Sequence, residues 1–309
     1  MRQGNKKTQV KRTSPPILQG SIVALVTPFQ KGNVDFVGLK NNIQFQLRNK
    51  TKGFVPCGTT GEAPTLTEAE WTAVIETTVK TVNKKAPVIA GCGTNSTQKT
   101  ITLTKKVKEL GADAALIVAP YYNKPTQEGL YRHFRAVCDS VDMPVVIYNI
   151  PGRTGVNILP KTLERLAKDC LNFIAVKEAS GSLDQVSEII ERCGDRITIL
   201  SGDDSLTLPM LAIGGKGVIS VIANIVPKEL SEMIEDYFAG KIKQAFNLHR
   251  KLFPLAKAMF VETNPIPIKT AMNLIGMPAG DLRLPLCKPS AESLLIIKKA
   301  LTDFGFVLK

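Results

Sequence analysis

The chain has 309 residues, of which 44% are hydrophobic and 22% are charged. This composition is typical of a globular protein with a sizeable core and excludes a largely disordered chain. The formal net charge is +13, but five of the basic residues lie within the first 12 positions and the others are spread beside acidic residues. Because no nucleic-acid-binding motif interleaves these charges with aromatic residues, we interpret them as a solvated basic surface.

The N-terminal segment, residues 1–17, is predicted to be a basic tail outside the folded part. It lacks the apolar stretch of a signal peptide, and no apolar run in the chain is long enough to cross a membrane. The six cysteines are scattered without a CxxC pair, which is typical of reduced thiols. We therefore expect a cytoplasmic protein, with a transit peptide as the alternative interpretation of the tail.

Short apolar segments alternate with amphipathic stretches through the next part of the chain. Eight segments are predicted strands: 21–29, 53–58, 87–92, 114–120, 144–149, 173–178, 197–202 and 217–221. Helical patterns lie between them, for example at 37–50, 65–80 and 160–170. Strands that are apolar along their whole length indicate a parallel sheet covered on both faces. The pattern predicts an α/β fold, a (β/α)8 or TIM barrel over residues 18–240. A doubly wound sheet is the alternative, but no GxGxxG follows the first strand.

Residues 241–309 show helical patterns only and are predicted to form a small C-terminal helical region. Two proline-containing stretches interrupt them, NPIPIK at 264–269 and RLPL at 283–286. We expect both to be extended connections.

Polar groups follow several of the predicted strands, where a barrel gathers its active residues. They are GTTGE at 58–62, PYYNKP at 120–125, YNIPGRTG at 148–155 and Lys177. The only two histidines, His133 and His249, lie within helical patterns. A Ser-His-Asp triad or a multi-histidine metal site is therefore disfavoured.

Lys177 ends an otherwise apolar strand and is the candidate nucleophile. Strand alternation places Phe173, Ala175 and Lys177 on one face. If that face is the barrel interior, desolvation lowers the lysine pKa and leaves a free amine to attack a carbonyl group. The alternative is a lysine whose ammonium reaches water at the strand end.

The neighbouring groups suggest partners for such an amine. Tyr148 could transfer protons, Thr59 and Thr60 could bind a carboxylate on a tight turn, and Arg153 could face an acidic substrate. Taken singly, these groups are also compatible with a core tyrosine, an ordinary turn and a solvated arginine.

These motifs, together with LSGDD at 200–204 and NPIPIK, resemble those of the pyruvate-dependent class I aldolases of the dihydrodipicolinate synthase and N-acetylneuraminate lyase family. The resemblance extends from about residue 18 to the C-terminus. It implies that Lys177 forms a Schiff base with pyruvate and that no metal or organic cofactor is needed. It also implies that Tyr148 is the general acid/base in a proton relay with Thr59 and Tyr122.

The same resemblance assigns binding roles. Thr60 would bind the pyruvate carboxylate, and Gly202 and Ile219 would line the pyruvate pocket. Tyr122 would reach the neighbouring subunit's site, which implies a homo-oligomer, a dimer of dimers. Arg153 would hold the carboxylate of L-aspartate-4-semialdehyde, whose condensation with pyruvate yields 4-hydroxy-tetrahydrodipicolinate in lysine biosynthesis. A sugar-acid or sialate aldolase and a catalytically silent barrel are the alternatives.

Two positions bear on regulation. Glu68 and Lys99 stand where lysine-inhibited members of the family tend to have a histidine and an acidic residue, in a pocket near Tyr121 and Asn95. Because Lys99 would repel the ammonium of an incoming lysine, feedback inhibition by lysine is expected to be weak or absent.

Overall fold

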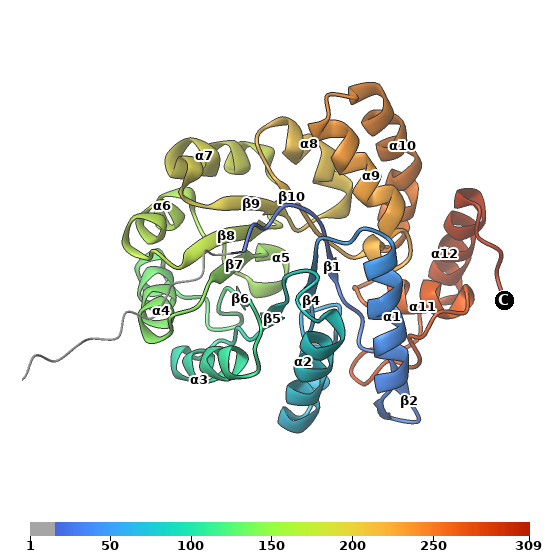
Figure 1. Ribbon diagram of the computed structural model, residues 1–309, viewed down its shortest axis with the longest axis horizontal. Helices are drawn as coiled ribbons and strands as arrows, with labels where there is room; N and C mark the ends of the chain where they lie inside the picture. The colour runs from blue at the N-terminus through green and yellow to red at the C-terminus, as the bar shows by residue number, and fades with distance from the viewer. Residues whose placement is uncertain (1–15) are drawn as a thin grey trace, which may run out of the picture.

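The computed structural model describes residues 16–309, so the predicted tail lies almost wholly outside the described residues. Eight parallel strands form one sheet in the order β4-β1-β10-β9-β8-β7-β6-β5. Their bounds are β1 Gly20–Ala24, β4 Gly53–Val55, β5 Ile89–Gly91, β6 Ala114–Val118, β7 Val145–Asn149, β8 Phe173–Glu178, β9 Thr198–Ser201 and β10 Gly217–Ser220. A parallel bridge between Phe54 in β4 and Val88, which directly precedes β5, joins the two edge strands of the sheet and closes the barrel. The predicted (β/α)8 barrel is confirmed (Figure 1).

Helices cover the outside of the barrel. Their bounds are α1 Phe36–Arg48, α2 Glu68–Val82, α3 Thr97–Glu109, α4 Gln127–Ser140, α5 Pro151–Thr154, α6 Pro160–Asp169, α7 Leu183–Cys193, α8 Thr207–Ala212 and α9 Pro227–Phe238. A small hairpin of β2 Phe29–Gln30 and β3 Asn33–Val34 follows β1. Polar caps explain where several helices begin: Thr67 and Glu70 form a reciprocal capping box at α2, and Ser96 caps α3.

Three further helices follow the barrel and lie together at one side of the molecule (Figure 1). They are α10 Ile242–Ala258, α11 Ile266–Leu274 and α12 Ala291–Phe304. The expectation that residues 264–269 form an extended connection is wrong, because α11 already begins at Ile266. Pro267 is compatible with the first turn of a helix, where its missing N–H has no intrahelical partner to lose. The division of the chain at residue 241 remains a prediction.

The barrel interior is a small apolar cluster that includes Ile22, Leu116, Val146 and Ala175. Phe173 belongs instead to the larger core between strands and helices. The register explains the difference, because Phe173 pairs with Val145 while Ala175 already pairs with Val146. The extra residue in β8 reverses, at that point, the alternation of side chains between the barrel interior and the outer face of the sheet. The prediction that Phe173 shares a face with Lys177 is therefore wrong.

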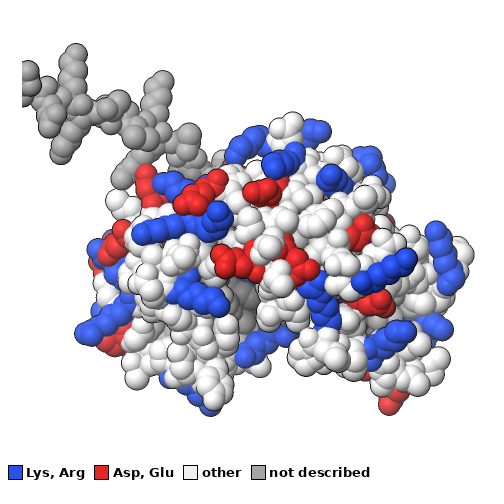
Figure 2. Space-filling view, turned by 90° about the horizontal axis from the view of Figure 1, so that it is seen from below, with Lys and Arg blue, Asp and Glu red and all other residues white. Residues whose placement is uncertain are grey.

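Positive and negative side chains are intermixed on the face shown in Figure 2, where blue groups lie beside red ones. Many are paired within one helix, such as Arg132 with Glu128 and Arg192 with Glu188. Such a mixture is expected of a solvated surface. Within residues 16–309, none of the helices has the length and apolar character needed to span a membrane.

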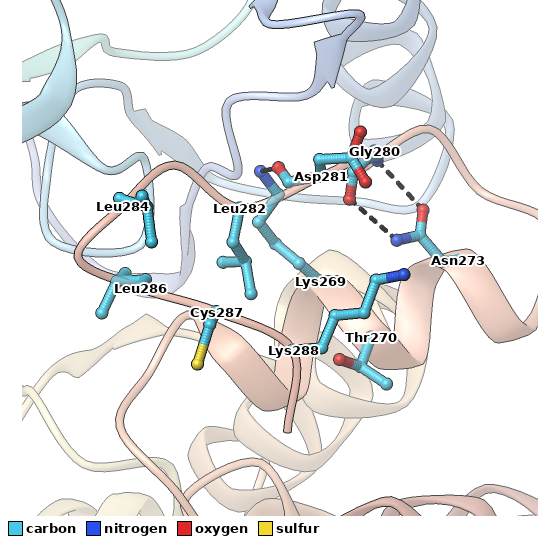
Figure 3. Close-up of a pocket in the computed structure, with 10 residues that line it drawn as sticks. All are labelled: Lys269, Thr270, Asn273, Gly280, Asp281, Leu282, Leu284, Leu286, Cys287 and Lys288. Atoms are coloured by element: carbon cyan, nitrogen blue, oxygen red, sulfur yellow. Dashed lines mark hydrogen bonds between the residues drawn. The ribbon is translucent and has the colours of Figure 1, made fainter. Parts of the chain in front are cut away.

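A buried ion pair joins the barrel to the C-terminal helices. The Lys269 ammonium in α11 lies 2.7 Å from a carboxylate oxygen of Glu62, and both side chains are almost fully buried. It also donates to the carbonyl oxygens of Asp281 at 2.6 Å and Thr27 at 3.3 Å. Figure 3 shows Lys269 extending from its helix toward Asp281. The second Glu62 oxygen accepts the Arg283 backbone N–H at 3.1 Å, so the network is well satisfied.

This network predicts a large loss of stability when one partner is removed. Lys269→Met leaves the Glu62 carboxylate buried without its counter-charge, which should lower the free energy of unfolding by roughly 3–5 kcal/mol. Urea unfolding followed by the fluorescence of Trp71 measures the change. Lys299→Met, which breaks an exposed pair with Asp303, is the control and should leave the midpoint almost unchanged. Equal midpoints for the two variants would contradict the prediction.

Candidate active site

Lys177 lies near the end of β8 with its side chain in the barrel interior. It is 7% exposed. Burial lowers its pKa to about 8; the Arg153 charge acts in the same direction and the Asp204 charge opposes it. An appreciable fraction of the side chain is therefore a free amine near neutral pH, as a nucleophilic lysine requires.

Tyr148 lies beside this amine at the end of β7. The two residues are register partners in adjacent strands, and the Lys177 nitrogen lies 4.2 Å from the centre of the tyrosine ring. Burial raises the pKa of Tyr148 to about 12, although the Arg153 charge and the Thr59 side chain act against this shift. The phenol is therefore protonated at neutral pH and can donate a proton to an atom bonded to the amine.

Thr60 lies in the turn after β4 and Arg153 lies in the short helix α5 after β7, and Asn264 connects them. The Asn264 side-chain N–H donates to the Thr60 hydroxyl oxygen at 3.0 Å. The Arg153 guanidinium donates to the backbone carbonyl oxygen of Asn264 at 2.9 Å. Because the Thr60 oxygen already accepts from an amide, its own O–H is left to donate to a bound carboxylate.

Gly202 bounds the space around Lys177. Gly202 follows β9, and its N–H donates to the Glu178 carbonyl oxygen at 2.7 Å. A Cβ atom at this position would lie 2.7 Å from the Ala179 Cβ and 3.2 Å from the Lys177 Cε. A side chain there would crowd the lysine, so glycine leaves room for a bound molecule. Ile219 is 1% exposed and belongs to the interior cluster.

Tyr122 is not brought to this site within one chain. Its side chain is 89% exposed, and its backbone has a φ of +74°. The chain therefore brings together Lys177, Tyr148, Thr60, Arg153 and Gly202, with Thr59 close to Tyr148. For Ile219 a place in the pyruvate pocket stays a prediction. The role of Tyr122 in a second subunit stays a prediction.

Two residues near the site were missed by sequence reasoning. Asn264 stands in NPIPIK and Asp204 stands in LSGDD, two motifs whose order points to the family but whose individual side chains carry no distinctive signal in the sequence. One Asp204 oxygen accepts the backbone N–H groups of Val221 at 2.9 Å and Ile222 at 3.1 Å. Burial raises the pKa of Asp204 to about 6.

Two of the cavities on the described surface lie near the C-terminal helices. One of about 620 Å³ is formed by Arg153, Gly152 and residues 260–264, next to the site. The other, about 310 Å³, lies between α11 and residues 280–288 (Figure 3). In it the Asn273 side chain exchanges hydrogen bonds with the backbone of Gly280, and none of the predicted site residues lines it. The first cavity is therefore the candidate entrance.

A buried amine at the end of a barrel strand, beside a protonated phenol and carboxylate-binding groups, is an arrangement suited to Schiff-base chemistry. The model of the dihydrodipicolinate synthetase family matches residues 17–304. The chain therefore belongs to the dihydrodipicolinate synthetase family.

Individual relatives agree with this assignment. The chain is 53% identical to a 4-hydroxy-tetrahydrodipicolinate synthase of Thermodesulfovibrio yellowstonii, over 94% of this chain and 100% of the relative. A crystal structure of a dihydrodipicolinate synthase matches with a TM-score of 0.92 and 52% identity, over 94% of this chain and 100% of that one. A structure from Cyanidioschyzon merolae with lysine bound matches with a TM-score of 0.91 and 41% identity, over 94% and 99% of the two chains.

The lowered pKa of Lys177 predicts a pH profile for adduct formation with pyruvate, the keto acid that the family resemblance implies. Only the free amine attacks, so the rate should rise about tenfold per pH unit below the pKa and level off above about 8. Borohydride trapping at a series of pH values, followed by mass spectrometry, measures it. Lys177→Arg should give no adduct. A rate that still rises steeply at pH 10, as for an exposed lysine, would overturn the assignment.

Proposed function

We propose that this protein is a Schiff-base-forming lyase that condenses pyruvate with L-aspartate-4-semialdehyde to 4-hydroxy-tetrahydrodipicolinate, a step of lysine (diaminopimelate) biosynthesis. The observation that carries the proposal is the buried Lys177 amine, 4.2 Å from the Tyr148 ring centre, in a member of this family. The relatives named as 4-hydroxy-tetrahydrodipicolinate synthases, at 53% identity over nearly the whole chain, support the choice of substrates.

Imine formation is the first step. The neutral Lys177 amine adds to the keto carbon of pyruvate and forms a carbinolamine. Tyr148 supplies the proton that lets the carbinolamine hydroxyl leave as water, and the imine remains on the lysine. Thr60 donates its hydroxyl hydrogen to the pyruvate carboxylate. Gly202 leaves a space beside the lysine that suits a small keto acid. Ile219, in the interior cluster, would line the same pocket.

Carbon–carbon bond formation follows. Loss of a methyl proton from the imine gives an enamine, whose carbon attacks the aldehyde of the semialdehyde, and the new alkoxide takes up a proton. The amino group of the product then attacks the imine carbon, closes the ring and releases Lys177 as an amine. Tyr148, Thr59 and Tyr122 of a neighbouring subunit carry the protons, and Arg153 holds the carboxylate of the semialdehyde.

Assembly is part of the proposal. Tyr122 is 89% exposed in one chain, and a homo-oligomer, a dimer of dimers, would bring it to the site of a neighbour. We place this enzyme in the cytoplasm. All six cysteines are free, which is compatible with a reducing compartment.

The direct test is condensation of pyruvate with L-aspartate-4-semialdehyde, coupled to a reductase that consumes the product. We expect turnover by the wild-type protein and none by Lys177→Arg. A pyruvate adduct on Lys177 without turnover would instead favour a sugar-acid or sialate aldolase, which uses a different second substrate. A folded protein that traps no pyruvate would instead be a catalytically silent barrel.

Feedback by lysine is expected to be weak or absent. Lys99 and Glu68 are both exposed, and the nearby loops are linked by the Asn123 side chain, which donates to the Asn95 carbonyl oxygen at 2.9 Å. The Lys99 ammonium would repel that of a bound lysine. Millimolar lysine should therefore leave the condensation rate unchanged, and Lys99→Glu combined with Glu68→His should make the enzyme more sensitive. Inhibition of the wild type by micromolar lysine would refute this prediction.

A further inference from the structure

A set of polar side chains lies behind the reacting pair, on the outer face of the same two strands. Tyr148 pairs with Lys177 across β7 and β8, and the next pair in the register is Asn149 with Glu178. Because successive side chains of a strand point to opposite faces, this second pair points away from the barrel interior. Asn149 is 0% exposed and Glu178 is 2% exposed, so their polar atoms depend on protein partners.

The carboxyl group of Glu178 accepts hydrogen bonds from three uncharged amide groups. The Asn149 side-chain N–H groups donate to its two oxygens at 3.2 and 3.0 Å. The Ser180 backbone N–H donates to one oxygen at 2.7 Å, and the Gln185 side chain donates to the other at 3.2 Å. A carboxylate only accepts, so it suits this ring of donors, whereas a group of the same size that donates does not.

The side-chain amides in this network have one mutually consistent orientation. The Asn149 oxygen accepts the Ile158 backbone N–H at 3.0 Å, which turns its NH₂ group toward Glu178. That NH₂ group also donates to the Asn157 oxygen at 2.7 Å, and the Asn157 NH₂ group donates to the Gln185 oxygen at 2.7 Å. Turning over any one amide would bring two donors or two acceptors together. The Glu178 carboxyl group is therefore the acceptor at which the network ends.

This network is attached to the elements that carry the reacting groups. Asn149 follows Tyr148 in β7, and Glu178 follows Lys177 in β8. The Glu178 backbone carbonyl also accepts the N–H of Gly202, the glycine that leaves room beside the lysine. Burial raises the pKa of Tyr148, and the Glu178 charge acts in the same direction, which helps to keep the phenol protonated. A shift of the network would therefore be transmitted directly to the phenol and the amine.

We propose that Glu178 is a positioning residue for imine formation, whose carboxyl group holds the Tyr148 phenol in place beside the Lys177 amine from the outer face of the barrel. This inference rests on the proposed function, but only on its first step. Thr60, the expected partner of the pyruvate carboxylate, lies in the turn after β4, outside this network. A disturbance at Glu178 should therefore affect the rate of the reaction with pyruvate and spare its binding.

Glu178→Gln is the direct test, because it keeps the size of the side chain but places an NH₂ group among donors. Borohydride trapping at a series of pyruvate concentrations gives the maximal rate of adduct formation and the half-saturating concentration. The maximal rate should fall roughly 10- to 100-fold, up to the loss expected when reacting groups are misplaced by about 1 Å. The half-saturating concentration should change by less than about twofold, since a pure rate effect leaves binding intact.

A double-mutant cycle with Tyr148→Phe shows whether the effect passes through the phenol. If Glu178 acts by positioning that group, Glu178→Gln should slow trapping by less than about twofold in the Tyr148→Phe background, because coupled sites are not additive. A further loss as large as in the wild-type background would overturn the inference. Gln185→Met, which removes one donor to Glu178 from the half-buried end of the network, should give a smaller loss with the same dependence on Tyr148.

Asn172 provides a matched control at the opposite end of β8. Its side chain donates to the backbone carbonyl oxygens of Cys138 at 3.0 Å, Val141 at 2.9 Å and Met143 at 3.2 Å. Asn172→Ala should lower the thermal unfolding temperature but leave the trapping rate of the folded protein unchanged. A fall in that rate equal to the one in Glu178→Gln would assign Glu178 a general structural role and overturn the inference.

The outcomes also distinguish this inference from the proposed function. Wild-type protein that traps no pyruvate on Lys177 would contradict the proposed function itself. A normal wild-type adduct together with an unchanged rate in folded Glu178→Gln would contradict only the positioning role. Thermal unfolding of each variant gives the fraction of folded protein to which the rates are referred.

Discussion

The ion pair between Glu62 and Lys269 is the interaction on which the arrangement of the site depends. Glu62 ends the GTTGE turn that carries Thr59 and Thr60, and Lys269 lies in the helix that follows Asn264. Two charges buried this deeply are stable only when they remain paired and hydrogen-bonded. The pair therefore holds the turn after β4 against α11, which brings Asn264 within hydrogen-bonding distance of Thr60.

Desolvation sets the pKa values of the two reactive groups in this site, Lys177 and Tyr148. A closed parallel barrel surrounds Lys177 with apolar side chains and leaves its ammonium poorly solvated, which lowers its pKa to about 8. The same burial raises the pKa of Tyr148 to about 12. One environment thus favours the neutral form of both groups, so that the amine can act as a nucleophile and the phenol as a proton donor.

Specificity is expected at the rim, where polar groups come from distant parts of the chain. Arg153 follows β7, whereas Asn264 precedes α11, and a single hydrogen bond joins them.

The alternation of apolar segments with amphipathic stretches and the order of the motifs were enough to predict the barrel and the candidate residues at its strand ends, because apolar runs and turn chemistry are local properties of a sequence. Lys177 could be singled out because a charge at the end of an apolar strand has few explanations. The face of Phe173 could not be predicted, since it depends on a register shift between β7 and β8. The contact of Asn264 with Arg153 and that of Lys269 with Glu62 could not be predicted either, because they join residues more than 100 positions apart. Only the closed tertiary structure determines which of these distant groups meet.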